Sequence, residues 1–196
     1  MTSAIVATLT QLTRDLDSVG VGWALIGGFA VSARAEPRFT RDLDVCVLVR
    51  NDEDAENTVA ALVHLGYSIA SIVEHEYQDR LATVRLDSPV GGGVLVDLLF
   101  ASSGLEPEIV ASAESLEILS RVVVPVARRA HLVVLKLLSR DDAVRPQDAM
   151  DLRALRPTLT AQDAEEIREL ATLVADRGFH RERDLRTLAE GYLAGD

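Results

Sequence analysis

The sequence predicts an α/β fold: a mixed sheet flanked by helices and followed by a C-terminal helical bundle. Two observations support this class. Residues 1–125 alternate helix-like segments with short apolar runs typical of strands, and the pattern from residue 126 onward is helical. Hydrophobic residues make up 48% of the 196 residues, which is enough for a core. We expect an α/β domain over residues 1–125 and a helical domain over residues 126–196.

Hydrophobic periodicity places the individual elements. Apolar residues at three- and four-residue steps, or an acidic start, predict helices in the first part over residues 4–19, 29–35 and 51–65. Nearly continuous apolar runs predict strands over residues 23–26, 43–49, 67–73, 81–86 and 94–100. Three glycines at 91–93 predict the turn between the last two strands. The second part is expected to form helices over residues 128–140, 146–155, 161–177 and 182–193.

Charge and composition limit the partners and the location. The net charge of −11 and the 4% aromatic content argue against a protein that binds nucleic acid over its whole surface or through rows of stacked rings. Residues 121–156 are an exception, because eight cations stand there against four acids, and this basic island could receive a polyanion. A single cysteine, Cys46, no leader-like start and no apolar run near the roughly 20 residues of a membrane span predict a cytoplasmic protein with no membrane association.

Three aspartates stand out at or within apolar strands. Strand alternation puts Thr40, Asp42 and Asp44 on one face, and Asp97 is the single charge in the run 94–100. A buried unpaired carboxylate is costly, so neighbouring strands would bring these acids together around a hard cation such as Mg²⁺. Two alternatives stay open: Asp42 and Asp44 facing solvent, and Asp97 paired with an arginine such as Arg85.

The glycine pair Gly27-Gly28 lies between an expected strand and an expected helix. Such a turn presents free backbone N–H groups, and glycine lets a phosphate approach the backbone closely. A plain turn is the alternative. The sequence contains neither a P-loop motif nor a dinucleotide-binding glycine fingerprint, so it supports neither of those folds.

Lys136 is the only lysine among 20 basic residues, and it lies in a helix that is apolar on nearly every side. A compact ammonium there suggests contact with a nucleotide phosphate, with a structural lysine that extends along its apolar stem as the alternative. Asp148 and Asp151 follow in the next expected helix. Acids are favoured in a first helical turn, so the sequence does not decide which of the two is functional.

These motifs together resemble a known family. G-G-x-A at 27–30, R-x-T-x-D-L-D at 38–44, an isolated strand aspartate, a helical lysine and D-x-x-D-L at 148–152 are similar to the AbiEii/MenT-type toxin nucleotidyltransferases of the DNA polymerase β-like superfamily. The resemblance spans residues 23–155 and implies a minimal nucleotidyltransferase sheet. It implies nucleotide binding by Gly27, Gly28, Arg38, Thr40 and Lys136, catalysis by Asp42, Asp44, Lys136 and Asp151, and Mg²⁺ binding by Asp42, Asp44 and Asp97.

The resemblance also implies a function. It predicts the toxin of a toxin–antitoxin pair that transfers pyrimidine nucleotides, preferably from CTP, to the 3′ end of tRNA and blocks translation, with a cognate antitoxin as partner. It further suggests that phosphorylation of Thr40 would silence the enzyme, since a dianion beside Asp42 and Asp44 repels nucleotide. The alternatives are a lincosamide or aminoglycoside nucleotidyltransferase and a catalytically inactive binding module of the same fold.

Overall fold

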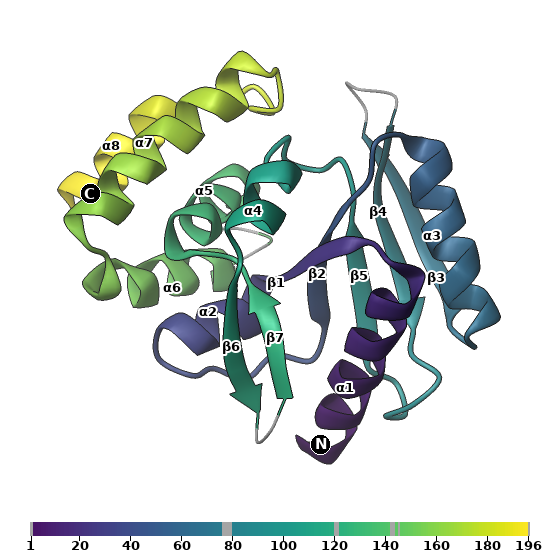
Figure 1. The fold of residues 1–196 in the computed structure, drawn as a ribbon. Helices are drawn as coiled ribbons and strands as arrows, with labels where there is room; N and C mark the ends of the chain where they lie inside the picture. Colours follow the sequence, from purple (N-terminus) through teal and green to yellow (C-terminus); the bar gives the residue numbers. More distant parts are fainter. Residues whose placement is uncertain (1, 76–79, 120–121, 142–143, 145, 196) are drawn as a thin grey trace.

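A seven-stranded mixed sheet forms the centre of the molecule, with strand order β3-β4-β5-β2-β1-β7-β6 (Figure 1). The computed structural model describes residues 2–75, 80–119, 122–141, 144 and 146–195. The strands are β1 Gly22–Ile26, β2 Leu43–Leu48, β3 Ser68–His75, β4 Arg80–Asp87, β5 Leu95–Leu99, β6 Glu114–Leu119 and β7 Val122–Val126. The helices are α1 Thr2–Val19, α2 Gly27–Arg34, α3 Asp52–His64, α4 Glu106–Ser112, α5 Arg129–Ser139, α6 Pro146–Leu155, α7 Ala161–Asp176 and α8 Leu185–Ala194, with a 3₁₀ turn at Arg156–Thr158.

The pairing of the central strands determines where polar residues meet. Strand β2 runs antiparallel to β1 and parallel to β5, and its register places Asp44 opposite Ile26 on one side and Asp97 on the other. Strand β4 runs antiparallel to β5 and places Arg85 opposite Asp97. Because side chains at paired positions point to the same face of a sheet, these three charged residues are neighbours on one face.

The predicted α/β class, with a mixed sheet and helices at the C-terminal end, is confirmed. All the predicted elements are present, with shifted ends: α2 begins at Gly27, so the glycine pair is its first turn, and β2 begins at Leu43, so Thr40 and Asp42 precede the strand.

Helix α4 and the β6–β7 hairpin were not predicted. The hairpin is hard to recognise because Pro125 interrupts its apolar run. The proline is tolerated there because β7 pairs with β1 at a single position, Leu25 with Val126.

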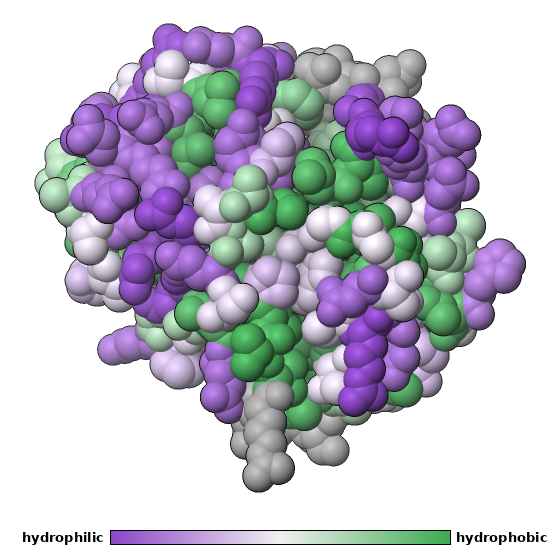
Figure 2. Space-filling view, in the orientation of Figure 1, coloured by the Kyte–Doolittle hydropathy of each residue, from purple (hydrophilic) through white to green (hydrophobic). Residues whose placement is uncertain are grey.

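Helices α5 to α8 gather at one end of the sheet beyond α2 (Figure 1). The division at residue 125 stays a prediction: helices follow β7, and the buried apolar residues of both parts belong to one continuous cluster. Apolar atoms also reach the surface over the β6–β7 hairpin in the face shown in Figure 2, where Val123 is 56% exposed. None of the helices in the described part of the chain has both the length and the apolar character of a membrane span.

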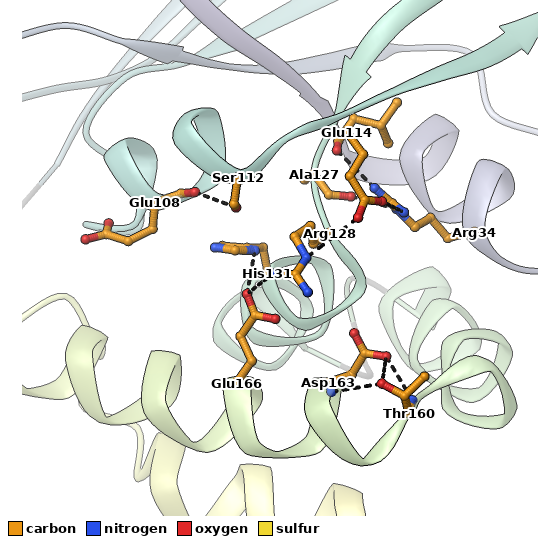
Figure 3. A network of polar contacts seen from close by, with 11 residues as sticks. Arg34, Glu108, Ser112, Glu114, Ala127, Arg128, His131, Thr160, Asp163 and Glu166 are labelled. Atoms are coloured by element: carbon orange, nitrogen blue, oxygen red, sulfur yellow. Dashed lines mark hydrogen bonds and ion pairs between the residues drawn. The ribbon is translucent and has the colours of Figure 1, made fainter.

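A buried polar network joins the helical end to the sheet (Figure 3). Arg34 of α2 donates from Nε to the carbonyl oxygen of Ala127 at 2.8 Å and from Nη1 to Glu114 of β6 at 2.5 Å. Arg128 donates to Glu166 of α7 at 3.2 Å. His131 is 1% exposed, and its Nδ1 lies 3.9 Å from Glu166 Oε1, beyond hydrogen-bonding distance. These contacts fix α2, and with it the glycine pair, against β7 and α5.

The environment of His131 makes the stability of this network sensitive to acid. Burial lowers the pKa of His131 to about 4, and the positive charge of Arg128 acts in the same direction. Between pH 6.5 and 4 the unfolded chain binds a proton at His131 that the folded chain does not, so this group by itself lowers the free energy of unfolding by about 3 kcal/mol across that range. Asp44, whose pKa is raised in the folded chain, contributes with the opposite sign in wild type and variant alike. In urea denaturation the wild type should therefore lose about 3 kcal/mol more than His131→Phe on acidification.

The exposed histidine of α3 provides the control for that measurement. His64→Gln should show the same decrease in the free energy of unfolding on acidification as the wild type, because His64 lies on the surface. If His131→Phe and the wild type changed equally with pH, the acid sensitivity would belong to another group.

Candidate active site

Two aspartates on adjacent parallel strands form the floor of a cavity of about 640 Å³. Asp44 of β2 and Asp97 of β5 both line it, and Asp97 is only 8% exposed. Asp42 lies just before β2, at the edge of the same region, with its side chain 40% exposed. The structure therefore brings together the three acids that the sequence predicted to meet.

The glycine pair begins α2 directly against Asp44. Gly27 has φ +64°, and a Cβ there would lie 2.0 Å from Asp44 Oδ2, so Asp44 would have to move to make room for a side chain. The backbone N–H of Gly28 is close enough to the Asp44 carboxyl group to lower its pKa. A Cβ on Gly28 would meet Arg38 Nη2 at 2.8 Å and Thr40 Oγ1 at 3.0 Å. The residues predicted to bind nucleotide therefore surround the N-terminus of this helix.

The electrostatic environment of Asp44 favours a cation. Burial, followed by repulsion from Asp97 and Asp42, raises the pKa of Asp44 to about 7, while Lys136 and the Gly28 N–H partly oppose this rise. Within the described residues Asp44 forms no ion pair. A bound cation would restore the charged form of this carboxyl group.

Arg85 of β4 supplies the positive charge nearest to Asp97. Its Nε donates to Asp97 Oδ1 at 2.7 Å and its Nη2 donates to Oδ2 at 2.6 Å, while Nη2 lies 3.8 Å from Asp42 Oδ2. The alternative pairing of Asp97 with Arg85 is thus confirmed. Among the residues that the structure describes, no three carboxylate, imidazole or thiol groups are arranged to hold a metal ion.

The donor chemistry of the site nevertheless fits Mg²⁺. Asp42 and Asp44 offer hard carboxylate oxygens, and Mg²⁺ characteristically binds through one or two carboxylates together with water and substrate phosphates. Burial and the neighbouring Asp97 raise the pKa of Asp44, so a cation bound there would stabilise its charged form. Arg85, paired with both oxygens of Asp97, competes with a cation for that carboxylate.

A second charged network lies across the cavity on α5 and α6. Lys136 Nζ lies 2.6 Å from Asp148 Oδ1 and 2.9 Å from Asp151 Oδ2. Arg38 donates to both oxygens of Asp151, from Nη2 at 2.8 Å and also from Nε. Ser139 Oγ donates to Asp148 at 3.0 Å. Asp148 and Asp151 are 3% and 1% exposed; Asp148 lines the cavity, and Asp151 contacts both Arg38 and Lys136.

Several cavity residues were not recognised in the sequence. Ser139 follows Lys136 by three residues, a helical spacing that could have identified it. Ser102, Ser103 and Arg181 also line the cavity, and no sequence pattern marks them. Arg181 lies between α7 and α8 with φ 51° and donates from Nη2 to the Ser102 carbonyl oxygen at 2.8 Å.

Two cations of the basic island differ in their surroundings. Lys136 lines the cavity, whereas Arg128 pairs with Glu166. Three further members, Arg121, Asp142 and Arg145, lie outside the described residues.

This architecture is that of a nucleotidyltransferase, and solved structures share it. An antigenic nucleotidyltransferase-like protein from Paracoccidioides brasiliensis matches with TM-score 0.54 and 18% identity over 95% of this chain and 92% of that one. The antibiotic-resistance factor ANT(2″)-Ia matches with TM-score 0.52 and 18% identity over 99% of this chain and 95% of that one. At such identities these similarities show the fold alone. No curated protein matches the chain.

The chain belongs to the AbiEii family, whose description is nucleotidyl transferase AbiEii toxin of a type IV toxin–antitoxin system. The family model matches residues 12–193, which includes every site residue described above. The predicted resemblance is confirmed, and the protein is a nucleotidyltransferase.

The close contact between Gly27 and Asp44 gives a testable result. Gly27→Ala and Gly92→Ala both place alanine at a positive φ, but Gly92 has no atom within 4 Å of an added Cβ. Gly92→Ala should therefore lose only the conformational term, about 1 kcal/mol of unfolding free energy. Gly27→Ala should lose about 2 kcal/mol more, because Asp44 must move, and should also weaken nucleoside triphosphate binding. Urea denaturation and calorimetric titration measure both effects, and equal losses in the two variants would contradict this contact.

Proposed function

We propose that this protein is the toxin of a toxin–antitoxin pair that transfers nucleotides, preferably from CTP, to the 3′ end of tRNA and thereby blocks translation. The observation that carries the proposal is the position of Asp44, which lies beside Asp97 and against the N-terminus of α2 in one cavity. Family membership supports nucleotidyl transfer and the toxin role. The choice of CTP and tRNA follows from the motif resemblance, and a cognate antitoxin is the expected protein partner.

The chain's own groups bind and orient the nucleotide. The N–H groups that open α2 would bind the triphosphate, as helix N-termini bind phosphate, and the Gly28 N–H next to Asp44 is one of them. Lys136 lines the same cavity, while Arg38 and Thr40 border Gly28. Asp42 and Asp44 would hold Mg²⁺, which when bound offsets the charge of the triphosphate and lowers the pKa of the acceptor hydroxyl. Positioning and charge would thus supply most of the catalysis.

The charges that line the cavity balance one another. The acids are Asp44, Asp97 and Asp148, and the cations are Arg85, Lys136 and Arg181. Arg85 is paired with Asp97 and Lys136 with Asp148, so these two cations are already engaged in the free protein. The choice of tRNA over a cationic drug therefore rests on the motif resemblance.

Removal of the negative charge of either half-buried acid, Asp42 or Asp44, should strongly reduce transfer. Asp42→Asn and Asp44→Asn should each lower incorporation of α-labelled CTP by at least about 10²-fold, because each removes a negative ligand from the reacting site. Asp87→Asn, an exposed position at the end of β4, is the matched control and should retain activity. Circular dichroism should confirm that all three variants fold. Normal incorporation by folded Asp44→Asn would refute the proposal.

The acceptor can be identified by comparing the substrate classes in separate reactions. Total tRNA, tRNA oxidised by periodate at its 3′ end, a lincosamide and an aminoglycoside should be incubated separately with the enzyme, Mg²⁺ and each of the four labelled nucleoside triphosphates. Label should appear on intact tRNA, most strongly from CTP, and should be lost after oxidation because the 3′ hydroxyl is destroyed. Label on a drug, with none on tRNA, would establish the antibiotic-modifying alternative.

A further inference from the structure

Arg85 places a positive charge beside two of the acids predicted to bind a metal ion. It lies directly opposite Asp97 in the antiparallel pair β4–β5, and its planar fork engages both oxygens of that carboxylate at 2.7 and 2.6 Å. The same Nη2 lies 3.8 Å from Asp42 on the other side. One guanidinium therefore bridges two of the three acids that the sequence predicted as metal ligands.

This pairing competes with metal binding by Asp97. The guanidinium occupies one lone pair on each carboxylate oxygen, and its positive charge, held against both oxygens, opposes the approach of a cation. Asp97 is 8% exposed, so it has little access to water as an alternative partner. The Arg85 side chain is 40% exposed and lines the cavity, so it can leave without unpacking the core.

We propose that Arg85 is a replaceable counter-ion of the site: it neutralises Asp97 in the free protein and is displaced from Asp97 when a divalent cation binds. The proposal rests on the proposed function and deepens it by adding a positioning residue. The displaced guanidinium stays in the cavity, where its fork matches the oxygens of a phosphate group. The carboxylates would then bind the cation while Arg85 binds the triphosphate.

This exchange predicts coupling between the two ligands. Without nucleotide, a cation must break the Arg85–Asp97 pair with no compensation for the guanidinium, so its affinity is lowered. With nucleotide, the phosphates take up Arg85 and the affinity rises. By linkage, the cation must strengthen nucleotide binding by the same factor.

The direct test measures Mn²⁺ binding to nucleotide-free protein, from the electron paramagnetic resonance signal of the free ion. Arg85→Gln should bind Mn²⁺ about tenfold more tightly than the wild type, because a charge-assisted pair no longer competes for Asp97. Arg80→Gln is the matched control: it lies on the same strand and pairs with Asp52 at 2.9 Å, on a different part of the surface, and should leave the affinity unchanged. An unchanged or weaker affinity in folded Arg85→Gln would overturn the proposal.

A second measurement uses the wild-type chain and does not depend on the stability of the variant. The Nε–H proton of Arg85 can be followed by NMR, with its signal assigned by its absence in Arg85→Lys. In the free protein this proton should exchange slowly with water, because Asp97 accepts its hydrogen bond. Saturating Mg²⁺ with an α,β-methylene triphosphate should change its shift and exchange rate. A signal that stays unchanged at saturation would overturn the proposal.

The outcomes distinguish failure of the proposed function from failure of the proposed role of Arg85. Wild-type protein that binds no Mn²⁺ even with nucleotide, or Asp44→Asn that binds it as the wild type does, would remove the metal site and with it the proposed function. Equal Mn²⁺ affinity in the wild type and Arg85→Gln, with binding lost in Asp44→Asn, would remove only the role of Arg85.

Discussion

The arrangement of the site depends on how the negative charges of the carboxylates in one cavity are compensated. Asp44 and Asp97 are forced together by the parallel register of β2 and β5, and burial with their mutual repulsion raises the pKa of Asp44 to about 7. The surrounding elements offset this cost in different ways. Arg85 pairs with Asp97 from the neighbouring strand, and the backbone N–H of Gly28, in the opening turn of α2, lowers the pKa of Asp44. Asp44 itself remains without a full counter-charge in the described structure.

The second network explains why the helical end of the chain belongs to the site. Lys136 on α5 and Asp148 and Asp151 on α6 form ion pairs that are nearly closed to solvent, and Arg38 from the loop before β2 completes them. Each cation is held by a carboxylate that can share it with an anionic ligand. A triphosphate in the cavity would therefore meet cations that are already oriented, so little conformational freedom is lost on binding.

Local residue patterns were sufficient to predict much of this arrangement. Hydrophobic periodicity identified the core helices and central strands, and the glycine pair with Asp42, Asp44 and Lys136 marked the site. The choice of Arg85 as partner of Asp97 needed the strand order β4-β5-β2, which is a long-range property that no local pattern encodes. Arg181 reaches the cavity only through the turn between α7 and α8, and the β6–β7 hairpin is obscured by Pro125.

Anomalous diffraction from crystals grown with Mn²⁺ and an α,β-methylene nucleoside triphosphate would locate the metal and the nucleotide directly. We expect a manganese peak within coordination distance of the carboxylate oxygens of Asp42 and Asp44, with a phosphate oxygen within hydrogen-bonding distance of the Gly28 N–H. Manganese bound away from these two carboxylates, or a triphosphate that does not approach α2, would contradict it.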